Sequence, residues 1–191
     1  FISNFSTGRQ GYEIANSLAA FGAKTILISG PTNIEAAKNV EVIEVMSGKE
    51  FLQHSIDNLP CDIFISVAAI SDWRIKKTQK NKIKKNNIRD IEFILNDDVL
   101  KNISSHKKKP KLVIGFSAET KNLLKNTKKK LIEKGCDWIL ANEVTDDNAF
   151  LSDKNKIYFF DQKKVHEWSK MRKRMVALKL TKKIVSFFKK K

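Results

Sequence analysis

The sequence has few of the residues that build zinc sites and disulfide frameworks. It contains two cysteines and three histidines, Cys61, Cys136, His54, His106 and His166. The cysteines do not follow the C-x2–4-C spacing of structural zinc sites, and no histidine lies near a cysteine along the chain. We therefore expect neither a zinc centre nor a structural disulfide, and we expect a cytoplasmic protein.

Long apolar runs are also absent. No stretch approaches the roughly 18–20 consecutive apolar residues that cross a bilayer, and residues 1–11 lack the charged-then-apolar layout of a secretory signal. Hydrophobic residues nevertheless make up 41% of the 191 residues, which is enough to build the core of a globular protein. We expect one domain over residues 1–191.

Acidic residues are scarce relative to basic ones, since 21 aspartates and glutamates face 37 lysines and arginines, for a formal net charge of +16. A basic chain attracts polyanions, so nucleic acid, a membrane surface and phosphorylated small molecules are candidate partners. The basic residues are spread along the chain and form no recognised nucleic-acid-binding motif. Compositional bias therefore explains the charge as well as a partner does, and a basic nucleic-acid-binding module stays a minor alternative.

Strand-like and helix-like segments alternate along the chain. Short apolar runs predict strands at 25–29, 40–46, 62–69, 91–95, 112–116, 137–141 and 157–160. Helical spacing and cap residues predict helices at 12–21, 47–60, 120–134 and from about 169 onward. This alternation predicts an α/β, three-layer Rossmann-like fold, with a mainly parallel sheet, helices on both faces and a late antiparallel edge. The apolar run at 62–69 is expected at the centre of the sheet.

Two of the predicted helices offer apolar side chains to the core. For the helix at 120–134 these are Leu124, Leu131 and Ile132. For the last helix they are Met171, Met175, Leu178, Val185 and Phe188, which we interpret as a core stripe rather than a membrane or partner surface.

Ligands of parallel α/β sheets bind beyond the carboxyl ends of the strands, so the loops there are the candidate site. Residues 4–11 precede a helix, and their glycines and hydroxyls suit a phosphate cradle at a helix N-terminus. A tight turn with close helix packing explains the same glycines. Because this loop begins almost at residue 1, we expect the chain to be an N-terminally truncated piece that lacks its first strand.

Charged and aromatic side chains follow other predicted strands. Asp72 can accept a hydrogen bond from a sugar hydroxyl or hold a metal ion, or it can cap a turn. Phe116 can stack on a base or fill the core. Lys130 and Lys134 are four residues apart on one helix face, where they can bind a polyphosphate or solubilise the helix.

The stretch at 76–89 has no apolar periodicity and is rich in lysine and asparagine. Long loops inside compact domains are often lids. Its Lys82 can neutralise phosphates or a carboxylate when such a loop closes. A solvated basic run is the alternative interpretation of the same residues.

Six motifs, in this order, resemble the phosphopantothenoylcysteine synthetase family over nearly the whole chain. They are Ile2-Ser3-Asn4 with Ser6-Thr7-Gly8 and Gly11, Ser29-Gly30-Pro31-Thr32, Ala68-Ala69 with Asp72-Trp73, Lys82-Ile83-Lys84-Lys85, Gly115-Phe116-Ser117-Ala118-Glu119-Thr120, and Ala141-Asn142-Glu143. In many bacteria this domain is the C-terminal half of a bifunctional flavoprotein, behind a phosphopantothenoylcysteine decarboxylase. The family's usual segment before Asn4 is missing here.

The resemblance implies a reaction and a set of site residues. The carboxylate of 4′-phosphopantothenate is activated with CTP and Mg²⁺ as an acyl-cytidylate, and the amine of cysteine then expels CMP. Asn4 is expected to contact the acyl-cytidylate, and Lys82 is the lid lysine. The substrate phosphate is assigned to Ser6, Thr7, Gly8 and Gly11. The positions around the nucleotide are Ser66, Val67, Ala68, Asp72, Lys82, Asp97, Asp98, Val99, Leu100, Phe116, Lys130 and Lys134.

The resemblance also implies cofactors and partners. Mg²⁺ is expected to be held mainly by the triphosphate, and FMN is needed only if a decarboxylase domain is fused upstream. The family forms dimers with the active site close to the subunit interface, so a homodimer or higher oligomer is expected. We expect no nucleic acid and no membrane among the partners.

A NAD(P)-dependent Rossmann-fold reductase is the main alternative. Residues 6–11 do not form G-x-G-x-x-G, and no acidic residue ends a strand about 20 residues further on. A Tyr-x-x-x-Lys pair is absent as well, because Asn16 and Gln162 stand four residues after Tyr12 and Tyr158. Thermal shifts with CTP, ATP and NAD(P) distinguish the two hypotheses.

Overall fold

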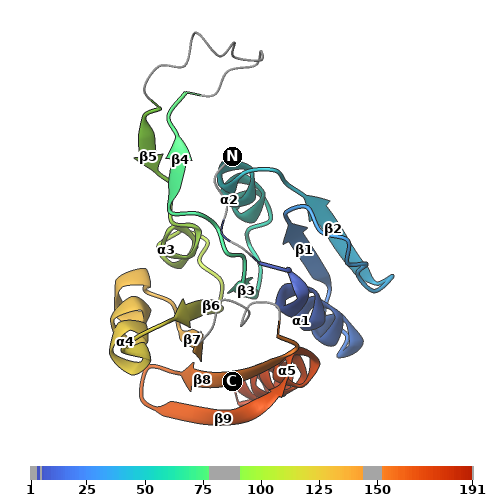
Figure 1. The fold of residues 1–191 in the computed structure, drawn as a ribbon. Coiled ribbons are helices and arrows are strands. Elements are labelled where there is room, and N and C mark those ends of the chain that lie inside the picture. The colour runs from blue at the N-terminus through green and yellow to red at the C-terminus, as the bar shows by residue number, and fades with distance from the viewer. Residues whose placement is uncertain (1–3, 5, 78–90, 144–151, 191) are drawn as a thin grey trace.

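The computed structural model describes residues 4, 6–77, 91–143 and 152–190. Helices and strands follow one another along these residues (Figure 1). The helices are α1 Arg9–Ala20, α2 Gly48–Asp57, α3 Val99–Ser104, α4 Leu123–Lys134 and α5 Lys173–Lys189. The strands are β1 Thr25–Ser29, β2 Val40–Glu44, β3 Ile63–Ser66, β4 Trp73–Ile75, β5 Phe93–Leu95, β6 Leu112–Glu119, β7 Trp138–Glu143, β8 Lys154–Phe160 and β9 Val165–Arg172.

The strands form three sheets in the described part of the chain. β1 and β2 are a parallel pair, and a 5-stranded sheet has the order β3-β6-β7-β8-β9. In the larger sheet β3, β6 and β7 run parallel, whereas β8 and β9 are antiparallel. β4 and β5 form an antiparallel pair that projects from the rest as an arm (Figure 1). The predicted α/β Rossmann-like class is confirmed.

Helices cover both faces of the larger sheet, as predicted. Along β6, Leu112 and Ile114 pack with α1 and α5, whereas Val113 faces α4. Neighbouring side chains of a strand point to opposite faces, so an unbroken apolar run fits a strand that is buried on both sides. A third cluster joins α2 and α3 around Phe51 and Ile103.

The antiparallel edge differs from the prediction in extent. β8 is the expected late strand, but β9 lies outside it and forms the true edge. The pattern placed residues 169–172 in the last helix, whereas α5 begins at Lys173. Only Trp168 of β9 is fully buried, so the strand carries almost no apolar alternation, and pairing with β8 determines its conformation.

The central position predicted for residues 62–69 is wrong among the described residues. β3 covers four residues and pairs with β6 at one end of the sheet. Ile63 and Ile65 contact one core cluster, and Phe64 contacts two further clusters. Burial on both faces therefore explains the apolar run, and that burial does not determine how many strands flank it.

Helix boundaries follow the cap residues closely. Ser47 and Glu50 form the predicted capping box of α2, with Glu50 N donating to Ser47 Oγ at 3.2 Å. Gly135 ends α4 in the left-handed conformation, with φ 64°. α3 and β4 were not predicted, because six and three residues are too few to show a period.

The predicted core residues of the two late helices are confirmed only in part. In α4 the buried residues are Leu123, Thr127 and Leu131, while Leu124 and Ile132 are 54% and 69% exposed. In α5 the buried set is Lys173, Val176, Ala177, Leu180, Thr181 and Ile184. Of the predicted residues, Met171 of β9 and Phe188 of α5 are partly buried against the core, whereas Met175 is 49% exposed. Both helices are rich in apolar residues on more than one face, so the sequence allows two phases and the neighbouring elements select one.

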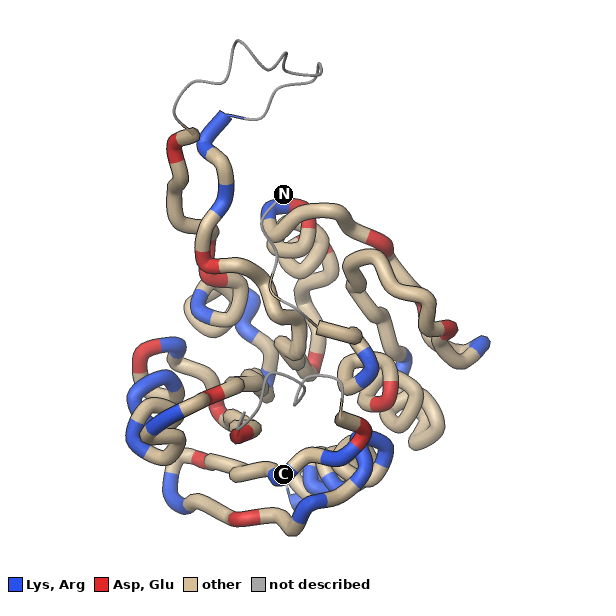
Figure 2. The backbone as a smooth tube through the Cα atoms, in the orientation of Figure 1, with Lys and Arg blue, Asp and Glu red and all other residues tan. Residues whose placement is uncertain are grey.

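Basic residues recur on α4, α5, β8 and β9 rather than gathering on one element (Figure 2). This distribution agrees with the compositional interpretation of the net charge. No helix in the described ranges is long and apolar enough to span a bilayer.

Candidate functional site

One cleft brings the predicted site residues together. It has a volume of about 2700 Å³ and is lined by the N-terminal loop, α1, β1, β3, α3 and the end of β6, with side chains of α4. The predicted residues that line it are Asn4, Ser6, Thr7, Gly8, Gly11, Ser66, Val67, Ala68, Asp72, Asp97, Asp98, Val99, Leu100, Phe116, Lys130 and Lys134. Lys82 and the rest of 78–89 lie outside the described residues.

The N-terminal loop leads directly into α1, so an anion beside it would lie at the positive end of the helix dipole. Gly8 precedes α1 in the left-handed conformation, with φ 72°, which favours glycine. The backbone N–H groups of Gly8 and Arg9 donate to the hydroxyls of Ser6 and Thr7 at 3.3 and 3.4 Å. The first turn of α1 has no acidic side chain, so the positive end of the helix dipole is not neutralised there.

Asn4 connects this loop to the segment that follows β3. Its Nδ2 donates to the carbonyl oxygen of Ile70 at 3.1 Å. Ile70 in turn packs on the start of α2, where a Cβ on Gly48 would lie 3.0 Å from Ile70 Cγ2. The side-chain amide of Asn4 is thereby held at the carboxyl end of the parallel strands.

Asn96 holds the same region in place by hydrogen bonds, although it is not among the site residues predicted from the sequence. Its Nδ2 donates to the carbonyl oxygen of Ser71 at 2.7 Å, and its backbone N–H donates to that of Asp72 at 2.8 Å. These bonds connect the loop of Asp72 to the segment that contains Asp97. The only sequence signal for this role was its place beside two predicted aspartates.

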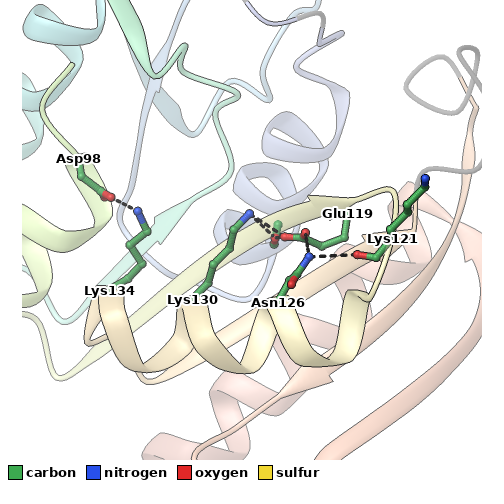
Figure 3. Close-up of polar contacts among 7 residues, drawn as sticks. Asp98, Glu119, Lys121, Asn126, Lys130 and Lys134 are labelled. Carbon is green, nitrogen blue, oxygen red and sulfur yellow. Dashed lines mark hydrogen bonds and ion pairs between the residues drawn. The ribbon is translucent and has the colours of Figure 1, made fainter. Parts of the chain in front are cut away.

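The two predicted lysines of α4 point the same way, and each contacts a carboxylate (Figure 3). Lys134 pairs with Asp98, whose other oxygen accepts from Lys101 N at 2.9 Å and caps α3. Lys130 lies 2.6 Å from Glu119 Oε1. α3 and the end of β6 are therefore joined to α4 by ion pairs next to the cleft.

Glu119 was not among the predicted site residues. Its carboxylate accepts hydrogen bonds from Ser117 Oγ at 2.5 Å and from Asn126 Nδ2 at 3.2 Å, besides the lysine. Burial raises the pKa of this carboxyl, but the hydrogen bonds from Lys130, Ser117 and Asn126 outweigh burial and hold the pKa below its usual range. Glu119 is therefore ionised at neutral pH.

Close packing determines the position of Leu100 in the cleft. A Cβ on Gly115 would lie 2.6 Å from Leu100 Cδ2 and 3.3 Å from Ile139 Cγ1, so glycine lets α3 approach β6. Phe116 is half-buried, lines the cleft and also contacts the main core. Both roles considered for Phe116 thus remain compatible with its position.

A smaller cavity of about 630 Å³ adjoins the N-terminal loop and is lined by Thr7, Arg9 and Lys173, among others. Lys173 is buried and lines the large cleft as well. Burial, followed by the nearby Arg9, lowers the pKa of its ammonium, and Asp153 opposes them. Nothing in the sequence pattern singles out this lysine, because the predicted last helix places it in a helix interior.

Metal binding by protein groups alone is not indicated in the residues that the structure describes, which include no cluster of three or more His, Cys, Asp or Glu side chains suited to an ion. Asp72 and Asp97 both line the cleft. Their carboxylates are the oxygen ligands that Mg²⁺ prefers, and it usually keeps further oxygens from phosphates and water.

Comparison with known proteins gives consistent matches. The family described as DNA/pantothenate metabolism flavoprotein C-terminal domain matches residues 1–188. The coenzyme A biosynthesis bifunctional protein CoaBC of Haemophilus influenzae is 37% identical over 162 residues, which are 84% of this chain and 40% of that protein. The CoaBC protein of Borreliella burgdorferi is 34% identical over 186 residues, covering 95% of this chain and 47% of that protein.

The fold has a solved counterpart. The crystal structure of the C-terminal domain of a CoaBC protein superimposes with a TM-score of 0.83 and 31% identity, covering 100% of this chain and 88% of that one. The chain spans less than half the length of the two curated relatives described above.

Proposed function

The chain belongs to the family of DNA/pantothenate metabolism flavoprotein C-terminal domains, and from this premise we propose that it is a phosphopantothenate–cysteine ligase of coenzyme A biosynthesis. The observation that supports the proposal most is that one cleft is lined by all the predicted site residues that the structure describes. One part of the cleft is lined by the glycine-containing loop of Gly8, which we propose binds a phosphate. Another part is lined by Lys130 and Lys134. A substrate phosphate and a nucleotide triphosphate repel each other, so a ligase must bind both near separate cations or dipoles.

The proposed reaction has two steps. An oxygen of the 4′-phosphopantothenate carboxylate attacks the α-phosphorus of CTP, and the bond to the β-phosphate breaks to release pyrophosphate. The amine of cysteine then attacks the acyl carbon, loses a proton and expels CMP. The amide of Asn4 donates toward the acyl-cytidylate, where a side-chain donor at a developing oxyanion contributes about 3 kcal/mol in comparable sites.

Mg²⁺ fits the proposed site as an ion held mainly by the triphosphate, with Asp72 and Asp97 as the nearby carboxylates. When bound, it reduces the charge of the phosphates. FMN belongs to the proposal only through a decarboxylase domain fused upstream. We place the protein in the cytoplasm, as a single domain with residues 76–89 as its lid.

Pyrophosphate release tests the proposal directly. The full-length protein is mixed with phosphopantothenate, cysteine and either CTP or ATP, and pyrophosphate is measured together with the amide product. We expect release that requires all three substrates and is faster with CTP. Thermal stabilisation by NAD(P) and not by CTP, without pyrophosphate release, would contradict the ligase and favour a reductase.

Lys82→Gln should reduce formation of the acyl-nucleotide by about a hundredfold or more in the full-length protein. A lysine that closes over two anions offsets their repulsion in the transition state, and glutamine removes that charge. Single-turnover pyrophosphate release measures the step. Lys125→Gln, an exposed lysine of α4 outside the cleft, is the control and should stay within twofold of the parent. Equal rates for both variants would rule out Lys82 as the lid lysine.

We propose that the arm formed by β4 and β5 binds a second copy of this chain. Trp73 pairs directly with Leu95 across the two strands, and these side chains are 52% and 64% exposed. An isolated two-stranded sheet is marginally stable in water, so an apolar face on one indicates that a further surface covers it. This assignment agrees with the family's expected dimer.

Leu95→Lys should shift the protein from dimer to monomer, because a charge on the covered face would have to be desolvated in the dimer. Light scattering after size-exclusion chromatography measures the mass. Ile132→Lys introduces the same charge at an exposed site of α4 and should leave the dimer intact. A parent protein that is monomeric at micromolar concentration, or a Leu95→Lys variant that stays dimeric, would contradict the assignment.

A further inference from the structure

Glu119 lies behind the cleft rather than in it. The cleft is lined by its neighbours Phe116, Ser117 and Ala118 and by Lys130, but not by Glu119 itself. The residue is only 8% exposed, whereas the side chain of Lys130 is 44% exposed. A buried carboxylate thus contacts a cation (Figure 3), and that cation also lines the cleft.

The hydrogen bonds around Glu119 fix its orientation. One oxygen accepts from Ser117 and Lys130, and the other accepts from Asn126. Asn126 Nδ2 also donates to the carbonyl oxygen of Lys121 at 3.0 Å, which fastens the connection between β6 and α4. Each carboxylate oxygen therefore has a partner, and the partners together lie on β6 and α4. These bonds leave the carboxylate little freedom to rotate.

This arrangement determines where the ammonium of Lys130 lies. A lysine side chain has four rotatable bonds and, when exposed, samples many positions. Here the ammonium donates to Glu119 at 2.6 Å and to Ser117 Oγ at 3.3 Å, which uses two of its three donors. The third donor is left for an oxygen that approaches from the cleft.

We propose that Glu119 is a positioning residue for the nucleotide, which it orients by holding the Lys130 ammonium at the end of β6. The inference rests on the proposed function, because it takes the ligand of Lys130 to be the nucleotide. Other charged groups nearby are the Lys134–Asp98 pair one turn along α4 and Glu143, which is opposite Glu119 in the strand register. Glu119 is the acid in direct contact with Lys130 among the described residues.

A glutamine at this position tests the proposal with almost no change in shape. Glu119→Gln keeps one acceptor but removes the charge, and its amide N–H₂ group would face Asn126 Nδ2, the donor from which the second carboxylate oxygen had accepted. Calorimetric titration with CTP should give a Kd about tenfold weaker than the parent. The KM values for phosphopantothenate and cysteine should stay within twofold, which a general structural defect would not achieve.

The matched control is Glu133→Gln on α4, the helix that carries Lys130. Glu133 also pairs with a lysine, Lys129, at 3.6 Å, but both side chains are exposed and neither lines the cleft. Its Kd for CTP should stay within twofold of the parent. If Glu119→Gln does not fold, Ser117→Ala removes one hydrogen bond of the same group and should weaken CTP binding about threefold.

A double-mutant cycle decides whether Glu119 acts through Lys130. In a Lys130→Gln background, Glu119→Gln should change the Kd for CTP by less than twofold. If Glu119→Gln weakens CTP binding as much in the Lys130→Gln background as in the parent, the inference is overturned. An unchanged or tighter Kd for Glu119→Gln alone also overturns it. In either case a parent that still releases pyrophosphate leaves the proposed function intact. A parent protein that binds neither CTP nor ATP would instead overturn the proposed function together with the inference.

Discussion

Asn4→Asp should lower the overall rate of amide formation by about 10²–10³-fold, the cost of losing a donor at an oxyanion in comparable enzymes. The side-chain Nδ2 of Asn4 donates to the Ile70 carbonyl oxygen at 3.1 Å. An aspartate has no donor when ionised, so its carboxylate would repel both this carbonyl and the developing oxyanion. The activation step does not need that donor, so the acyl-cytidylate should accumulate and be detected by mass spectrometry.

The control for the change in charge is Asn39→Asp, because Asn39 is exposed and lies outside the cleft. This variant should have a rate within twofold of the parent. A normal rate for Asn4→Asp would remove Asn4 from the reaction. A slow rate without accumulated intermediate would place its role before activation rather than after it.

The candidate site was predicted from the sequence more completely than its supporting residues were. Loops at the carboxyl ends of parallel strands converge by the geometry of the fold, so Asn4, Asp72 and Phe116 share one cleft. The order of the six family motifs along the chain predicted these residues as site residues directly. Asn96 and Glu119 were missed because their contacts join segments 25 and 11 residues apart, which no local pattern encodes.

The fold was predicted best where one segment encodes its own structure. β1 was predicted with the bounds that the structure shows, and the capping-box residues Ser47 and Glu50 predicted the start of α2. β9 was missed and the buried face of α5 was predicted only in part, because both depend on which neighbours are available to pack against them. β9 has one buried residue and almost no apolar alternation, so its pairing with β8 is what identifies it as a strand.

That late edge is where we expect the largest loss of stability. Phe159→Ala should lower the free energy of unfolding by about 3–5 kcal/mol, against the 5–15 kcal/mol typical of whole domains. Phe159 is buried and stacks on Trp168 of β9 with ring centroids 5.6 Å apart, and it meets Trp138 of β7 edge-on at 5.2 Å. The ammonium of Lys183 in α5 lies 4.4 Å from its ring centroid. One side chain thus contacts three elements, and its removal leaves a cavity between them.

Urea unfolding followed by circular dichroism measures the loss, and Phe21→Ala is the control. Phe21 is 48% exposed at the end of α1, so its truncation should cost less than about 1 kcal/mol. No residue of β9 lines the cleft. The folded fraction of Phe159→Ala should therefore still bind CTP with a Kd close to that of the parent. Equal stability of the two variants would show that the ring of Phe159 is not part of the core. A large loss of CTP affinity in folded Phe159→Ala would show that the antiparallel edge supports the nucleotide site directly.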